Sequence, residues 1–287
     1  MTADLSTPAA TVAIPLDVSR RYLEALLNGD RATARQIVTD ATTTLENVGA
    51  YELLTALVYP TMELIQQLYR DDRITQTQLN LATRLNRSTA DQLTALLPFG
   101  APNGKKALIV CGNAEPEELG GQICADLFES AGWNVKFIGG GVPDDEVLKL
   151  VGEYRPDLLV FFATLPQGMP GVRKMIDYIR EVNALPALQI MCCGGIYKRA
   201  EGLAEEIGAD LFAEDAASAV HVAHDNPKRR ASVEQQTVGR NRRIKKAEIR
   251  RQQQTHRVAP PKLAPTGPTI DRSVDTDENN FPQSEAA

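Results

Sequence analysis

The stretch Ala107-Leu-Ile-Val-Cys111, followed directly by Gly112, decides the fold of this chain. It is a short apolar run, and a helical pattern follows it over residues 116–131. The alternation of apolar run and helix continues to residue 224; the other predicted strands are 135–138, 158–163, 188–193 and 211–213. Because these runs are apolar throughout, they indicate a parallel sheet covered on both faces. Right-handed connections then give a flavodoxin-like, doubly wound α/β domain with a five-stranded parallel sheet over residues 104–224.

An N-terminal four-helix bundle is predicted ahead of this domain, over residues 15–98. Apolar residues recur there at three- and four-residue intervals, for example Leu54, Val58, Met62 and Ile65. Asn28-Gly29 separates the first two helices, and Pro60 is expected to kink the third. Residues 98–104, with proline and glycine, form the linker to the α/β domain.

The net charge of −6 is unevenly spread. Residues 1–224 hold 18 basic against 29 acidic side chains, whereas residues 225–262 hold 12 against 3. The acidic globular part is therefore not a nucleic-acid reader. The basic stretch could make weak nucleic-acid contacts, but we favour a solvated, disordered tail over 225–287, basic and then acidic. Residues 1–14 are also predicted to be disordered.

Composition excludes several classes of protein. No apolar run reaches the length of a membrane span, and residues 1–15 do not resemble a signal peptide. The four cysteines, Cys111, Cys124, Cys192 and Cys193, lie in strand or helix patterns, which fits a cytoplasmic protein. Cys192-Cys193 lacks the spacing of a redox or zinc motif and is therefore expected to be a pair of buried strand thiols. His221 and His224 form either a surface helix end or a metal pair without a third ligand. We see no complete catalytic apparatus and expect no enzyme.

Ligands of doubly wound sheets bind at the carboxyl ends of the strands. Those ends carry Gly112, Gly139-Gly-Gly141 and Gly194-Gly195. Glycine lets a flat ligand or a phosphate approach the backbone, although it also serves in ordinary tight turns. The dinucleotide and Walker glycine patterns do not follow the first strand, so neither ligand class is expected.

The order of local motifs over residues 16–220 resembles the cobalamin-binding module of corrinoid methyltransferase carriers, methionine synthase and cobalamin-dependent light-responsive repressors. The similar stretches are Tyr22-Leu-Glu-Ala-Leu-Leu-Asn-Gly-Asp30, Gly120 to Trp133, Asp157 to Pro166, and Cys193-Gly-Gly-Ile196 with Gly208-Ala-Asp210. The resemblance implies a helical cap followed by a flavodoxin-like domain, with a corrinoid held between them as the cofactor.

The ligand loop departs from the family. The family motif Asp-x-His-x-x-Gly, whose histidine binds cobalt, corresponds here to Glu115-Pro-Glu117-Glu-Leu-Gly120. Two carboxylates cannot reproduce an imidazole oriented by an aspartate, because like charges repel unless one is protonated. We therefore expect binding without a protein histidine, with the cofactor's own base or water as the lower ligand.

The resemblance implies further cofactor-binding positions. The cap tryptophan and Glu-His pair of the repressors correspond to Tyr69 and to Leu79-Asn80. The serine that helps to hold the nucleotide tail corresponds to Phe162, a bulky side chain at the entrance of the tail. Thr164, Gly194 and Gly195 remain. Tyr69 could equally be an ordinary cap aromatic.

Three functions follow from this resemblance. The favoured one is a regulatory or sensory module that binds cobalamin without a protein histidine. The second is a degenerate module that serves as a protein-interaction scaffold, and the third is a corrinoid methyl carrier for a methyltransferase. A protein partner or a homo-oligomer is compatible with each.

Overall fold

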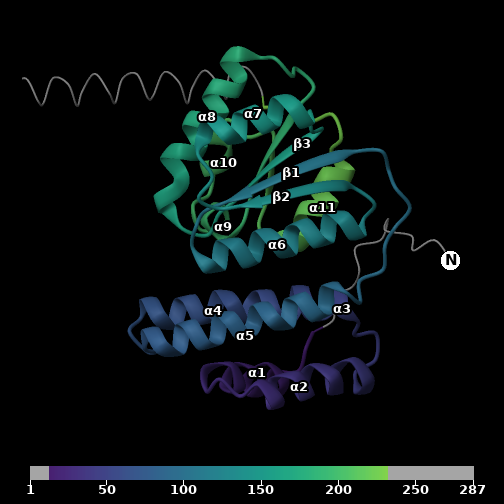
Figure 1. The fold of residues 1–287 in the computed structure, drawn as a ribbon, viewed down its shortest axis with the longest axis vertical. Coiled ribbons are helices and arrows are strands. Elements are labelled where there is room, and N and C mark those ends of the chain that lie inside the picture. Colours follow the sequence, from purple (N-terminus) through teal and green to yellow (C-terminus); the bar gives the residue numbers. More distant parts are fainter. Residues whose placement is uncertain (1–12, 232–287) are drawn as a thin grey trace, which may run out of the picture. The chain divides into compact units, whose positions relative to one another are not determined.

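The structure is a computed structural model that describes residues 13–231. The N-terminal segment 1–12 and the tail 232–287 lie outside the described residues, and with them nearly all of the two segments predicted to be disordered. Within the described part, the helices come first and the strands begin at residue 106, as the sequence indicates (Figure 1).

Helices α1 to α5 form the cap. Their bounds are α1 Leu16–Leu27, α2 Arg31–Thr44, α3 Ala50–Leu53, α4 Tyr59–Arg70 and α5 Gln76–Thr94. Asp30 caps α2 by accepting from the backbone N–H of Thr33, and Thr75 caps α5 in the same way through Gln78. Four helical runs therefore form the cap, because α3 and α4 are joined by the π-helical turn Leu54–Val58.

The π-helical turn is where Pro60 affects the cap. A proline has no N–H to donate to the preceding turn, and its ring needs extra room there. The wider turn supplies that room, with the N–H of Tyr59 donating to the carbonyl of Leu54. Buried Asn86 of α5 secures the turn, because its amide donates to the carbonyl of Val58 at 3.0 Å and its oxygen accepts from the Tyr22 hydroxyl at 2.9 Å.

The α/β part is a parallel sheet in the order β2-β1-β3-β4-β5, which confirms the flavodoxin-like, doubly wound prediction. Its strands are β1 Lys106–Cys111, β2 Asn134–Gly139, β3 Leu158–Phe162, β4 Gln189–Cys193 and β5 Leu211–Ala213. Its helices are α6 Glu115–Ser130, α7 Asp144–Tyr154, α8 Met169–Val182, α9 Gly195–Arg199, α10 Leu203–Glu206 and α11 Ala216–Asp225, with a short 3-10 turn at Pro166–Gly168.

Two short helices lie between β4 and β5. The first, α9, begins at Gly195, and α10 follows separately. Gly202, with a φ of +77°, breaks the helix between them. A left-handed glycine is a common way to end one helical turn and begin another.

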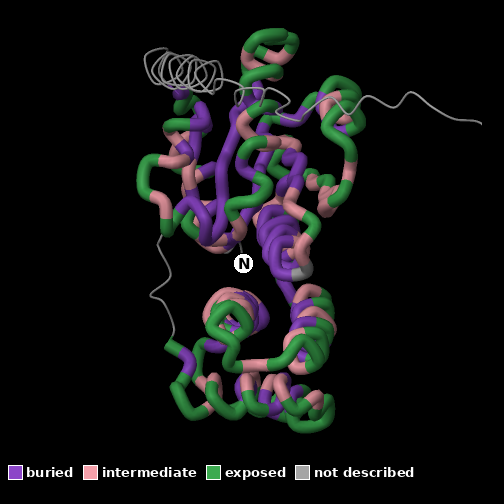
Figure 2. The backbone as a smooth tube through the Cα atoms, turned by 90° about the vertical axis from the view of Figure 1, so that its left-hand side faces the viewer, coloured by how far each residue is buried: buried purple, intermediate pink, exposed green. Residues whose placement is uncertain are grey.

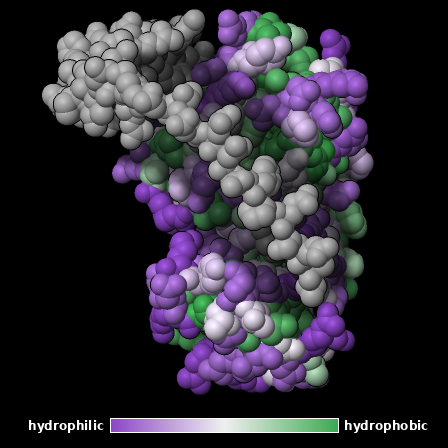
Figure 3. All heavy atoms as spheres, turned by 60° about the vertical axis from the view of Figure 1, so that its left-hand side comes forward, coloured by the Kyte–Doolittle hydropathy of each residue, from purple (hydrophilic) through white to green (hydrophobic). Residues whose placement is uncertain are grey.

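The two faces of the sheet have separate cores. Val160 and Phe162 point toward α6 and the cap, while Leu159 and Phe161 point toward α7 and α8. The strands other than the edge strand β2 are largely buried, as is much of α6, whereas the cap helices alternate between buried and exposed positions (Figure 2). Hydrophilic residues predominate on the cap surface seen in Figure 3. Among the described residues, no helix combines the length and apolarity that crossing a membrane requires.

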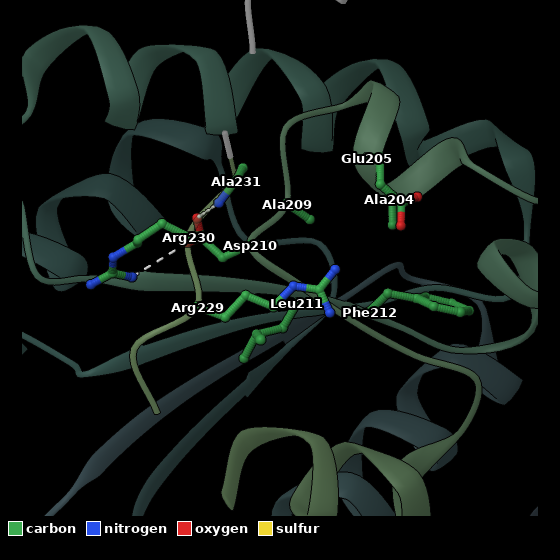
Figure 4. A pocket seen from close by; sticks show the side chains of 9 residues that line it. All are labelled: Ala204, Glu205, Ala209, Asp210, Leu211, Phe212, Arg229, Arg230 and Ala231. Atoms are coloured by element: carbon green, nitrogen blue, oxygen red, sulfur yellow. Dashed lines mark hydrogen bonds and ion pairs between the residues drawn. The ribbon is translucent and has the colours of Figure 1, made fainter. Parts of the chain in front are cut away.

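Segment 226–231 is tied to the amino edge of the sheet (Figure 4). The carboxylate of Asp210, fully buried just before β5, accepts from the backbone N–H groups of Ile190 and Ala231, both at 2.8 Å. It also pairs with Arg180 and Arg230. The start of the predicted tail therefore belongs to the folded part.

We predict that Asp210→Ala lowers the free energy of unfolding by about 3 kcal/mol, because it leaves Arg180 and two buried N–H groups without their acceptor. Urea denaturation measures the change, and Asp225→Ala, an exposed carboxylate of α11, is the matched control. Equal stability of the two variants would contradict this role for Asp210.

Candidate functional site

The carboxyl edge of the sheet forms a rim, which we define by Gly112, Thr164, Gly194 and Gly195. Gly194 follows β4 with a φ of +110°, and a Cβ there would lie 2.5 Å from the carbonyl oxygen of Ala163. Only glycine fits this close approach of β4 to β3. The structure thus brings Thr164, Gly194 and Gly195 together, as the sequence predicts.

Glu117 lies across this rim from the first turn of α6. Its side-chain oxygen Oε1 accepts from the backbone N–H of Thr164 at 2.9 Å and from that of Leu165 at 3.0 Å. A Cβ on Gly112 would lie 2.0 Å from the other oxygen, Oε2. The residue is 6 % exposed, so the carboxylate at the histidine position is buried and bonded to the end of β3.

Gly120 and Phe162 meet behind the rim. A Cβ on Gly120 would lie 2.4 Å from Cε1 of Phe162, so the missing side chain of α6 makes room for the ring from β3. Tyr59 of the cap packs edge-on against the same ring, with the centroids 6.3 Å apart. We call this space between β3 and α6 the channel; Phe162 fills it and is 1 % exposed.

Polar contacts join the cap to α6. The Arg87 guanidinium donates to Gln122 at 3.0 Å and lies 3.6 Å from the carboxylate of Glu118. The Gln122 amide in turn donates to Asp91 at 2.7 Å. One face of α5 therefore contacts α6. Other residues of α5 that share this helical face with Arg87 also point toward the α/β part.

A second cap contact reaches Gly195. A Cβ on Gly195 would lie 2.8 Å from Oε1 of Glu63 and 2.9 Å from Nη1 of Arg199. The same Arg199 donates to the carbonyl oxygen of Thr164. Partial burial raises the pKa of Glu63, while Lys198 and Arg199 oppose the rise. Glycine at 195 thus leaves room for a carboxylate from α4.

The predicted cap residues lie at the turn between α4 and α5. The Tyr69 hydroxyl donates to Gln76 at 2.6 Å, and the Gln76 amide donates to Asn80 at 3.0 Å. Asn80 lies seven residues before Arg87, about two turns of helix, and so shares the face that looks toward α6. Tyr69 is ten residues, or about 15 Å, along α4 from Tyr59. Glu115 begins α6, but its side chain is not among those described.

The cysteines and histidines that the structure describes do not gather into a metal site. Cys192 and Cys193 are buried in β4, as predicted, and burial raises the pKa of the Cys192 thiol to about 12. His224 lies at the end of α11 beside Asp225. In the described part of the chain, no three histidine, cysteine, aspartate or glutamate side chains come close enough to hold a metal ion.

Comparison with known proteins agrees with this architecture. Two family models, each described as a B12 binding domain, match residues 18–94 and 105–222. Dimethylamine corrinoid protein 3 of Methanosarcina mazei is 30% identical over 145 residues, which are 47% of this chain and 86% of that protein.

The chain belongs to the family of B12-binding corrinoid proteins.

A further relative and a solved structure support this assignment of the corrinoid protein. Dimethylamine corrinoid protein 1 of Methanosarcina acetivorans is 26% identical over 166 residues, 57% of this chain and 77% of that protein. The monomethylamine corrinoid protein of Methanosarcina barkeri has the same fold, with a TM-score of 0.63 at 20% identity, covering 73% of this chain and 98% of that one. The predicted family and the predicted cofactor class, cobalamin or a related corrinoid, are confirmed.

The residues present do not fit one mode of corrinoid binding. A lower imidazole is absent from the ligand loop, where Glu117 is bonded to two backbone N–H groups. The channel that the resemblance assigns to the nucleotide tail holds the ring of Phe162. Binding through a loop histidine with a buried tail is therefore incompatible with this arrangement.

Sequence reasoning missed Tyr59, Glu63 and Arg199. Tyr59 immediately precedes Pro60, and the π-helical turn it follows rotates it toward Phe162. Glu63 lies one turn further along α4. The four-residue spacing of Tyr59 and Glu63 could have shown that they lie on one face of α4. The π-helical turn before them, however, interrupts the periodic pattern that a regular helix would show.

Asp126 gives this cap interface a predicted pH dependence. Its carboxylate lies 2.8 Å from the Thr94 hydroxyl, and burial raises its pKa from 3.8 to about 6, more than the hydroxyl lowers it. Between these values the folded chain keeps a proton that the unfolded chain releases, so stability falls as the pH rises from about 4 to about 6.

Asp126→Asn should remove the fall in stability that Asp126 causes between about pH 4 and about pH 6, because an amide is neutral throughout this range. Melting temperatures across the window measure it, and Glu181→Gln, at an exposed position on α8, is the control. A decline of wild-type size in the asparagine variant would argue against the assignment.

Proposed function

We propose that this protein is a corrinoid carrier, which holds its cofactor between the cap and the rim and presents it to a methyltransferase partner. The names of the relatives, dimethylamine corrinoid proteins, support this class over the regulatory module that the sequence placed first. When bound, a corrinoid supplies a cobalt centre that can accept and release a methyl group. The chain would not itself be an enzyme, and the partner would supply the catalytic groups.

The observation that carries the proposal is a polar cap face beyond the contacts with α6. On α4, Gln66 and Arg70 continue the face of Tyr59 and Glu63 toward the α4–α5 turn, by helical spacing. On α5, Asn80 and Arg84 continue the face of Arg87. Arg70, Asn80 and Arg84 are exposed. The edge of a corrin carries amide side chains, which such residues can bind by hydrogen bonds.

The predicted site residues keep their proposed roles on this view. Asn80 would contact the corrin periphery, with Tyr69 positioning it through Gln76. Thr164, Gly194 and Gly195 would lie below the ring at the rim. Glu115, Glu117 and Gly120 would form the loop beneath it, without an imidazole.

Two other functions have an observation in their favour. Loss of the loop histidine at Glu117 favours a regulatory module that does not exchange methyl groups. The filled channel at Phe162 favours a scaffold that binds proteins without a cofactor. The basic stretch proposed for nucleic-acid contacts lies almost wholly outside the described residues.

We expect hydroxocobalamin and methylcobalamin to bind with a change in the visible spectrum. A ligand at a hundredfold excess over its dissociation constant should stabilise the fold by about 2.7 kcal/mol. Asn80→Ala should weaken binding by roughly fivefold, equivalent to about 1 kcal/mol for one hydrogen bond. Arg35→Ala, an exposed change on α2, is the control.

The carrier function predicts a second result. The protein loaded with methylcobalamin should lose its methyl group when a thiol acceptor and a methyltransferase that uses this acceptor are added, with formation of a thioether and cob(I)alamin. Binding that persists without demethylation would favour the regulatory module. Failure of every corrinoid to bind would favour the scaffold.

A further inference from the structure

The channel between β3 and α6 is blocked by side chains from three elements. Phe162 enters it from β3, and its ring packs so close to Gly120 of α6 that no side chain would fit there. Tyr59 of the cap packs against the ring edge-on. Phe162 and Tyr59 are 1 % and 5 % exposed. A planar base of similar size to the phenyl ring would need the same space.

The mouth of the channel is closed by Glu117. Its carboxylate accepts from two backbone N–H groups, of Thr164 and Leu165, and lies against the bare backbone of Gly112. Moving the side chain aside would leave two donors at the end of β3 without an acceptor, which is unfavourable in a buried position. Opening the channel therefore needs at least two side chains to move together.

The loops outside the rim are less crowded than the channel and the rim. Added Cβ atoms at Gly141 and Gly168, in the loops that follow β2 and β3, would meet no atom within 4 Å. Both loops lie at the carboxyl edge of the sheet. Space therefore remains at these two loops, outside the rim, while the channel behind the rim stays filled.

In free cobalamin at neutral pH, the dimethylbenzimidazole at the end of the nucleotide tail is bound to the lower face of cobalt. Removal of the base from cobalt becomes favourable in a protein that supplies a competing imidazole and a pocket for the displaced base. The ligand loop has Glu117 where that imidazole would stand, and Phe162 occupies the pocket.

We propose that the protein binds cobalamin with its own base still coordinated to cobalt, and that Phe162 and Glu117 select this form. This inference rests on the proposed corrinoid binding and specifies its mode. In this mode the nucleotide tail would not enter the channel.

The test is electron paramagnetic resonance of the full-length protein with cob(II)alamin, because a coordinated nitrogen splits each cobalt line into a triplet. We expect the triplet to persist on binding. Cob(II)inamide, which lacks the base, should bind without a triplet, which excludes nitrogen ligation by His221, His224 or His256. Loss of the triplet from bound cob(II)alamin, or its appearance in bound cob(II)inamide, would overturn the inference and leave corrinoid binding intact.

A variant extends the test to the two selecting residues. The double substitution Glu117→His with Phe162→Ser should open the channel and supply an imidazole. Bound cob(II)inamide should then gain a triplet. The control is Glu117→His with Phe161→Ser, which alters the neighbouring phenylalanine on the opposite face of β3 and should leave the channel filled.

The outcomes separate the two proposals. If neither corrinoid binds the wild-type protein, the proposed function itself fails. If both bind but the base leaves cobalt, only the binding mode fails. Should the double variant not fold, the wild-type spectra alone still decide the question.

Discussion

The bond between Glu117 and the end of β3 constrains the whole site. Two backbone N–H groups that would otherwise point into the rim are occupied by one carboxylate, and the same side chain lies over Gly112. This arrangement fixes the loop between β1 and α6 relative to β3. It also fixes α6, on which the cap rests through Arg87 and Thr94. A residue at the position of a metal ligand in the family has here become a structural tie.

The two ends of the parallel strands differ in structure. At the carboxyl ends of the strands, Gly195 lets Glu63 and Arg199 approach the backbone closely, and Thr164 is hydrogen-bonded through both its N–H and its carbonyl. At the amino edge, Asp210 gathers two arginines and two backbone N–H groups into a fully buried cluster. Charge is tolerated in that cluster because both oxygens of the carboxylate have partners and two of these partners are cationic. This buried cluster lies at the opposite ends of the strands from the rim.

The architecture could be predicted from the sequence because it depends on periodicity. Apolar runs such as 107–111 are buried on both faces, and a parallel order follows from their alternation with helices. The site was harder to predict from the sequence than the architecture. The departure at Glu117 and the bulk of Phe162 were visible, but their partners were not, since Thr164 and Gly120 are distant in sequence. Nothing in the local pattern shows that Gly120 is required by a ring from β3.

The π-helical turn at Leu54–Val58 has a consequence for the length of the cap. A wide turn contains one more residue than an ordinary one, so it shifts the angular phase of every residue after it by about 100°. Tyr59 and Glu63 reach the sheet because of that shift. The number of residues in this segment is therefore constrained as strongly as their identity. A homologue shorter by a single residue here would have to present other side chains to the ring of Phe162 and to Arg199.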